Sequence, residues 1–149
     1  MLKLSSAVIF FIFLSGCSIN QYMIKKEIAI NNQVLITEVA GTLKEQSRGL
    51  SGRADLCQNC AMLFPYKDYQ IRNFWMKGME FSLDFIWLKD GEIAGFSENI
   101  PVLNDQAEIS RVQSPSPVNQ VLEVRAGWVR ENNVKIGDKA EGLESPKLE

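Results

Sequence analysis

A hairpin signal lies in the middle of the chain, where Asp90-Gly91 separates the apolar run Leu83 to Leu88 from a second run, Glu92 to Phe96. An Asp-Gly pair between such runs favours a type I′ turn, because both of its central residues need positive φ angles. One charge, Asp84, falls inside the first run, and a buried carboxylate is costly unless it is paired or hydrogen-bonded. We therefore predict a β-hairpin at the centre of the domain, with partners around Asp84.

Other strand signals lie on both sides of this hairpin. Glu27 to Ala40 is β-like, and Asn31-Asn32 is a plausible turn within it. Val118 to Arg125 is rich in valine and is predicted to form a strand. Ser114 to Pro117 cannot be a central strand, because proline lacks the N–H that a sheet needs.

Helix signals are short. Thr42 to Glu45 matches a capping box, in which the threonine hydroxyl and the glutamate carboxylate accept hydrogen bonds from each other's backbone N–H groups, and Gly49 suits the helix end. Gly127 to Asn133 predicts one helical turn around Trp128. Many strands with few helical residues predict a mainly β fold, of the β-rich α+β kind: a sandwich-like sheet or a partly closed barrel with one or two short helices.

The N-terminus has the pattern of a lipoprotein signal peptide. Lys3 precedes an apolar stretch, Leu4 to Leu14, that is too short for a comfortable membrane span. Leu14-Ser15-Gly16-Cys17 then resembles the lipobox of bacterial lipoproteins, in which the chain is cleaved before the cysteine and its thiol carries diacylglycerol. An ordinary secretory signal with an incidental Cys17 is the alternative.

This pattern sets the expected domain organisation and location. We predict a signal peptide over residues 1–16, a tether over 17–26, a single globular domain over 27–142 and a tail over 143–149. Lipid on Cys17 would hold the mature protein at an extracytoplasmic membrane surface in the cell envelope.

Histidine is absent from all 149 residues, and the formal net charge is −2. The missing imidazole excludes Ser-His-Asp and Cys-His catalytic groups and every histidine metal site. The net charge shows no excess of basic residues of the kind that binds nucleic acid, so no nucleic-acid partner is predicted.

The cysteine pair Cys57 and Cys60 allows three interpretations. In an exported protein a local disulfide is favoured, whereas a redox pair needs a helix N-terminus and a closed zinc site needs four ligands. We predict the disulfide, with no cofactor and no metal.

The polar and aromatic residues of the central region can be interpreted either as structural residues or as parts of a functional site. Asp84 could act with Lys77 or Glu98 in general acid/base chemistry, but it is more simply a carboxylate that holds a loop. Trp75 lies beside Lys77 and could line a shallow site for a sugar or a peptide, although core packing is the usual fate of such an aromatic.

Ordered motifs over about residues 34–141 resemble a family of bacterial and archaeal proteins catalogued as domain of unknown function 192. They are Arg48-Gly49-Leu50, Met62-Leu63-Phe64, Phe74-Trp75-Met76-Lys77-Gly78-Met79, Ser82-Leu83-Asp84-Phe85, Asn99-Ile100-Pro101, Ser114-Pro115, Val121-Leu122-Glu123-Val124, Ala126-Gly127 and Gly137-Asp138. Gly78-Met79 replaces the family's Asn-Thr, and Ser82 replaces a proline. The resemblance implies a β-rich domain that is often exported, and it implies no established activity.

We therefore expect a lipid-anchored envelope protein that acts as a small binding or accessory module for a polar ligand, either carbohydrate or peptide, or for an envelope protein. The alternatives are a hydrolase using Asp84 with Lys77 or Glu98, and a thiol-disulfide redox protein using Cys57 and Cys60. The sequence identifies no catalytic residue, and the residues predicted to bind ligand are Arg48, Trp75, Lys77, Asp84, Asn99 and Glu123.

Overall fold

The computed structural model describes residues 23–103 and 108–143, so the predicted signal peptide and Cys17 lie outside the described residues. Two short helices and eight strands follow one another along the described chain: β1 (Ile24–Ile30), β2 (Gln33–Val39), α1 (Leu43–Arg48), β3 (Cys60–Gln70), β4 (Asn73–Trp75), β5 (Leu83–Lys89), β6 (Glu92–Ile100), β7 (Arg111–Gln113), β8 (Val118–Arg125) and α2 (Trp128–Glu131).

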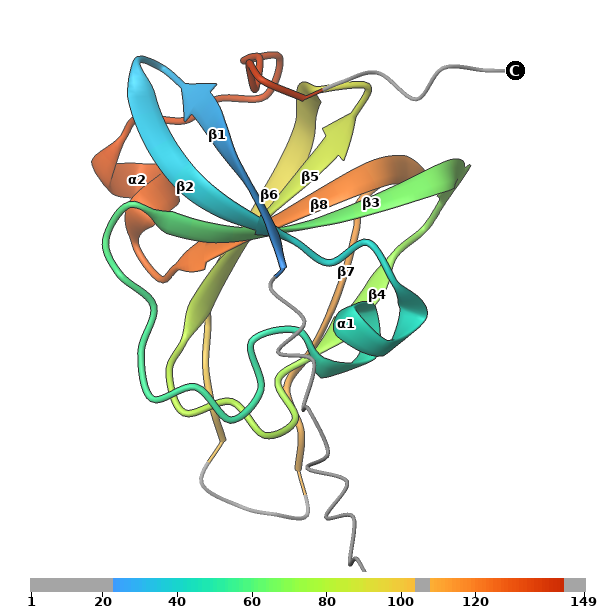
Figure 1. The fold of residues 1–149 in the computed structure, drawn as a ribbon, viewed down its shortest axis with the longest axis vertical. Coiled ribbons are helices and arrows are strands. Elements are labelled where there is room, and N and C mark those ends of the chain that lie inside the picture. The colour runs from blue at the N-terminus through green and yellow to red at the C-terminus, as the bar shows by residue number, and fades with distance from the viewer. Residues whose placement is uncertain (1–22, 104–107, 144–149) are drawn as a thin grey trace, which may run out of the picture.

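Six of these strands form one strongly twisted sheet in the order β1-β2-β3-β8-β5-β6 (Figure 1). Neighbouring strands are antiparallel except β2 and β3, which are parallel and are connected through α1. A parallel pair needs such a crossover, because a tight turn can only reverse the chain. The remaining strands, β4 and β7, form a separate two-stranded ribbon.

The predicted turns are confirmed. Asp90 and Gly91 have φ angles of 52° and 78°, and Asn31 and Asn32 have 50° and 63°. The first pair joins β5 to β6, and the second joins β1 to β2. Positive φ at two successive residues is what a type I′ hairpin turn requires.

The hairpin is displaced from the predicted centre. β6 is an edge strand, and the middle of the sheet is formed by β3 and β8. The reason is that β8, which is distant in sequence, inserts between β3 and β5 and pairs with both. Seven of the eight β8 residues are buried, because both faces of the strand are covered.

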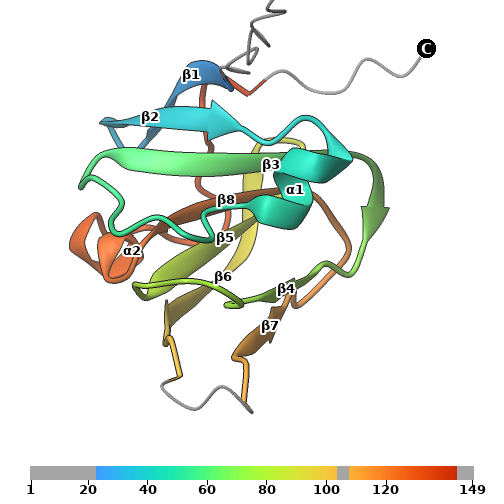
Figure 2. The ribbon, with the colours of Figure 1, turned by 60° about the horizontal axis from the view of Figure 1, so that its bottom comes forward.

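Two apolar clusters pack on the two faces of the sheet. One includes Leu122, Trp128 and the inner residues of the β1–β2 hairpin, and the other includes Phe64, Phe85 and Trp87. Helices α2 and α1 lie at opposite sides of the molecule (Figure 1), and the β4–β7 ribbon lies below the sheet (Figure 2). The mainly β, sandwich-like prediction with two short helices is confirmed, and the sheet is not closed into a barrel.

The domain reaches beyond its predicted ends. β1 begins at Ile24, inside the predicted tether, because Ile24 pairs with Val39 of β2. At the other end Leu143, assigned to the tail, packs against the first apolar cluster. No helix in residues 23–103 and 108–143 is long and apolar enough to cross a membrane.

Candidate functional site

Two adjoining hollows lie between α1 and β4. The outer one has a volume of about 440 Å³ and is lined by Leu43, Gln46, Ser47, Tyr66, Asn73, Phe74 and Trp75. The inner one has a volume of about 30 Å³ and reaches from the C-terminal end of α1 down to Glu123. The two share Gln46, Ser47, Phe74 and Trp75 as lining residues, and we refer to them together as the α1–β4 chamber.

Helix α1 forms one wall of the chamber and is fixed at both ends. The predicted capping box is present: Glu45 N–H donates to Thr42 Oγ1 at 3.2 Å, and Thr42 N–H donates to Glu45 Oε2 at 2.8 Å. Gln46 Nε2 then donates to the main-chain oxygens of Ala40 and Pro65, at 3.2 and 3.1 Å. These bonds orient the helix against β3.

Gly49 closes the chamber above Glu123. Its φ of 50° and ψ of −134° form a conformation that residues with a Cβ rarely adopt. A Cβ at this position would lie 3.4 Å from Phe64 Cζ and 4.0 Å from Glu123 Oε2. Glycine therefore both makes the turn after α1 and brings the main chain close to the buried carboxyl group.

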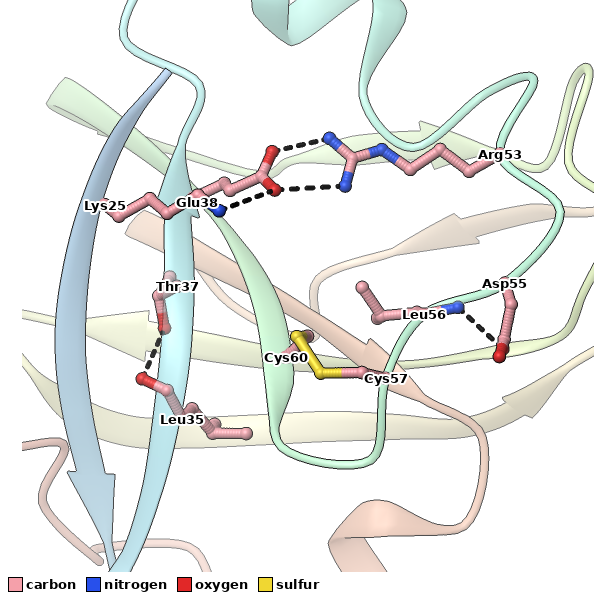
Figure 3. The surroundings of a disulfide bond; sticks show 9 residues. All are labelled: Lys25, Leu35, Thr37, Glu38, Arg53, Asp55, Leu56, Cys57 and Cys60. Carbon is pink, nitrogen blue, oxygen red and sulfur yellow. Dashed lines mark hydrogen bonds and ion pairs between the residues drawn. A yellow bond between two sulfur atoms is a disulfide. The ribbon is translucent and has the colours of Figure 1, made fainter. Parts of the chain in front are cut away.

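The loop after Gly49 is held to its surroundings by several bonds. Ser51 Oγ donates to the Lys77 main-chain oxygen at 2.7 Å. Arg53 donates two hydrogen bonds to the Glu38 carboxylate, at 3.2 and 2.5 Å, in the two-point geometry typical of arginine (Figure 3). This pairing also lowers the pKa of Glu38, chiefly through the hydrogen bonds from Arg53.

Strand β4 forms the opposite wall. Phe74 packs edge-on against Phe64, Phe85 and Trp87, with ring centroids 5.0, 5.5 and 5.9 Å apart, which anchors the strand to the sheet. Because side chains alternate along a strand, the next residue, Trp75, points away from this cluster. Trp75 is 51% exposed, whereas Trp87 and Trp128, the other two tryptophans, are buried.

Glu123 of β8 forms the floor of the chamber. It lies opposite Met62 of β3 and Phe85 of β5 in the sheet register and is 5% exposed. Its Oε2 atom has no hydrogen-bond partner among the described residues. Burial raises the pKa of Glu123 to about 8, against a smaller opposing effect of the Arg53 charge. At neutral pH the folded protein therefore holds mainly the uncharged acid.

The chamber brings together three of the six predicted binding residues: Arg48, Trp75 and Glu123. Arg48 is exposed at its rim. Lys77 has an exposed side chain that is not among the lining residues of the chamber. Its main-chain oxygen accepts the hydrogen bond from Ser51 that holds the loop after Gly49. Asp84 and Asn99 lie together elsewhere.

Asp84 is fully buried and holds two main-chain segments. Its Oδ1 accepts a hydrogen bond from Asn99 N–H at 2.7 Å, and its Oδ2 accepts one from Val129 N–H at 3.0 Å. The carboxylate thus joins the end of β6 to the start of α2. This geometry favours the structural interpretation of Asp84, because each of its oxygens accepts a main-chain N–H.

The disulfide between Cys57 and Cys60 is present, with a Cα–Cα distance of 5.0 Å. The pair closes a turn that leads directly into β3 (Figure 3), whereas a reactive cysteine pair is typically placed at the start of a helix. In the described part of the chain, no cluster of three or more acidic or cysteine side chains is arranged to hold a metal ion.

Several lining residues were missed by sequence reasoning. Gln46, Phe64 and Tyr66 had only the signals of a helix and of an apolar strand, which do not distinguish a chamber wall from ordinary core. The motif segments offered a better signal. Four of them meet at the inner hollow, which Arg48-Gly49-Leu50, Phe64, Phe74-Trp75 with Met79, and Glu123 all line.

Two crystal structures are similar to this chain. The first, a candidate transcription regulator from Sinorhizobium meliloti, is 28% identical with a TM-score of 0.72, and the match covers 80% of this chain and 95% of that one. The second, a protein of unknown function from Novosphingobium aromaticivorans, is 26% identical with a TM-score of 0.68, and the match covers 80% and 84%. No curated protein matches the chain.

The family comparison covers nearly the whole described domain. Residues 25–142 match the model of DUF192, which is described as an "Uncharacterized ACR". The match includes every motif quoted above and both walls and the floor of the α1–β4 chamber. The chain therefore belongs to the DUF192 family.

Proposed function

We propose that this protein is a small binding module of the cell envelope that takes a polar ligand, either carbohydrate or peptide, in the α1–β4 chamber. One observation carries the proposal: the buried Glu123, whose Oε2 has no hydrogen-bond donor among the described residues, lines the inner end of a hollow whose wall includes the exposed Trp75. An unsatisfied buried polar atom costs free energy in the folded state, so its retention favours a functional role.

The chemistry of the lining supports a polar ligand with an apolar face. Trp75 offers a large exposed ring on which a sugar ring or an aliphatic stem can stack. Gln46, Ser47 and Asn73 add amide and hydroxyl groups around the outer hollow. Apolar walls with a few convergent polar groups are typical of small-ligand sites.

Binding is favoured over hydrolysis by the positions of the acidic groups. A hydrolytic pair needs two groups that converge on one substrate. Asp84 lies outside the chamber, where its carboxylate accepts hydrogen bonds from two main-chain N–H groups. Glu123 is the single acidic residue among the described residues that line the chamber, so it has no acidic partner there.

The test is a binding map by two-dimensional NMR with hexoses, N-acetylhexosamines and short peptides. We expect ligand-dependent shifts at the Trp75 indole N–H and in residues 46–51, and Trp75→Ala should weaken binding about tenfold, as loss of a stacking ring predicts. Ile136→Ala is the matched control, because Ile136 is 69% exposed and outside the chamber. Shifts that are absent from the chamber, or equal effects of the two variants, would contradict the proposal.

The membrane location forms part of this proposal and has its own test. Lipid on Cys17 would place the chamber near the membrane surface, since only a short segment separates Cys17 from β1. The full chain expressed with labelled palmitate should incorporate the label and partition into detergent. Cys17→Ala should abolish both, and an unlabelled, water-soluble wild-type protein would contradict the anchor.

A further inference from the structure

We infer that the α1–β4 chamber selects a primary ammonium group, with Glu123 as its counter-ion and aromatic lining residues beside it. This inference rests on the proposed function and names its ligand chemistry. It predicts that ligands with a free amine, such as a lysine side chain or an amino sugar, bind better than their neutral analogues.

The first support is that no cation of the described chain neutralises Glu123. Arg53 is held by Glu38 through two hydrogen bonds. Arg48 is exposed at the rim, and Tyr66 is the remaining titratable group of the lining. Glu123 Oε2 thus lacks a donor, and an ammonium group supplies three.

The second support is the size of the two hollows. The inner hollow, at about 30 Å³, has room for one ammonium group, which is close to a water molecule in size. The outer hollow, at about 440 Å³, accommodates the rest of a sugar or a side chain. The charged end of a ligand would therefore reach Glu123, while its body contacts Trp75.

The third support is the aromatic lining. Phe64, Phe74 and Trp75 all border the inner hollow. Aromatic rings attract a cation electrostatically, and they give a neutral hydroxyl no such preference. An anionic group would instead meet the buried acid at the floor, and the cation of the lining, Arg48, lies out at the rim.

Proton release gives a readout that needs no variant. The pKa of Glu123 in the empty chamber is raised to about 8 by burial, so at pH 7 roughly nine in ten molecules carry the proton. An adjacent ammonium ion lowers this pKa, and the carboxyl proton passes to the buffer. Binding of an amine should therefore release close to one proton, whereas a neutral ligand should release almost none.

The experiment is isothermal titration calorimetry of the purified protein at pH 7 in buffers of different ionisation enthalpy. The probes are Nα-acetyl-lysine amide against its Nε-acetylated form, and glucosamine against N-acetylglucosamine. We expect at least one amine to bind tenfold or more tightly than its acetylated partner. The proton count uses the lysine pair, because the lysine ammonium stays charged at this pH.

Two variants locate the effect. Glu123→Gln keeps the shape of the side chain and should remove both the amine preference and the proton release, while Ile136→Ala should keep both. A preference for the lysine derivative alone identifies a peptide source, and a preference for glucosamine alone identifies an amino sugar. Either result supports the inference.

Three outcomes overturn the inference: equal or tighter binding of the neutral partners, amine binding without proton release, or no binding of either amine at millimolar concentration. Chamber shifts with neutral sugars or peptides in the NMR test would then still support the proposed function. Absence of those shifts as well would overturn both.

Discussion

Replacing Glu123 by glutamine tests the electrostatics of the chamber without any ligand. Glutamine has nearly the same shape and cannot ionise, so Glu123→Gln removes the titratable group and keeps the packing between Met62 and Phe85. Burial raises the pKa of Glu123 from 4.5 in its ordinary state to about 8 in the folded protein. Between these two pH values the folded state binds more protons than the unfolded state, so the stability contributed by Glu123 falls as the pH rises.

The expected magnitude follows from this difference. One pKa unit corresponds to about 1.4 kcal/mol. The difference between the pKa of Glu123 in the folded and the unfolded protein therefore lowers the free energy of unfolding by about 1 kcal/mol at pH 5, about 3 kcal/mol at pH 7 and up to about 5 kcal/mol above pH 8. Glu123→Gln avoids this penalty. The difference in unfolding free energy between the variant and the wild type should therefore grow in favour of the variant by about 3 to 4 kcal/mol from pH 5 to pH 8.

The assay is equilibrium urea unfolding of both proteins at half-unit steps of pH, and other titrating groups cancel in the difference. Met62→Leu is the control: it changes the neighbour of Glu123 in the sheet without changing any charge, so its effect should stay constant with pH. A Glu123→Gln difference that is flat from pH 5 to pH 8 would refute the reasoning, because it would mean that Glu123 ionises as readily in the folded protein as in the unfolded chain.

Three further substitutions test the supports of the fold. Asp84→Asn replaces one accepting oxygen by an NH₂ group that faces a main-chain N–H, and it should lower the unfolding free energy by about 3 kcal/mol in urea; a loss below about 1 kcal/mol would contradict the two-bond role. Gly49→Ala forces a Cβ into a backbone conformation with a φ of 50° and should lower stability by at least about 1 kcal/mol, seen as a lower Tm; an unchanged Tm would be the opposing result. The double variant Cys57→Ser, Cys60→Ser should lose at most about 2 kcal/mol and keep its circular dichroism spectrum, since the disulfide closes a very short loop; loss of the fold would show a larger role.

Local features of the fold were predictable because their causes lie within a few residues. Asp90-Gly91 and Asn31-Asn32 prefer the positive φ angles that their turns need. The capping box of Thr42 and Glu45 satisfies helix N–H groups three residues apart. The burial of Asp84 was expected from its apolar neighbours, although its partners, 15 and 45 residues away, were not.

The sequence predicted which residues are candidates for the site, from their types and motifs, but it did not predict which of them lie together in the folded protein. Arg48, Trp75 and Glu123 come from a helix end, a three-residue strand and a strand in the middle of the sheet. Asp84 and Asn99 belong to the same set of motifs, yet they are not among the chamber's lining residues and instead connect the end of β6 to the start of α2. No spacing in the chain distinguishes the first three from the last two.

The sequence by itself determined the hairpin turns, the capped helix, the buried aspartate and the motifs that mark the family, because each depends on short-range conformational preference or on a pattern of residue types. Only the tertiary structure decided the rest. It placed β8 between β3 and β5, and so carried Glu123 under Gly49 and beside Phe64. Sheet order results from pairing between distant strands, and the raised pKa of Glu123 results from the desolvation which that packing imposes.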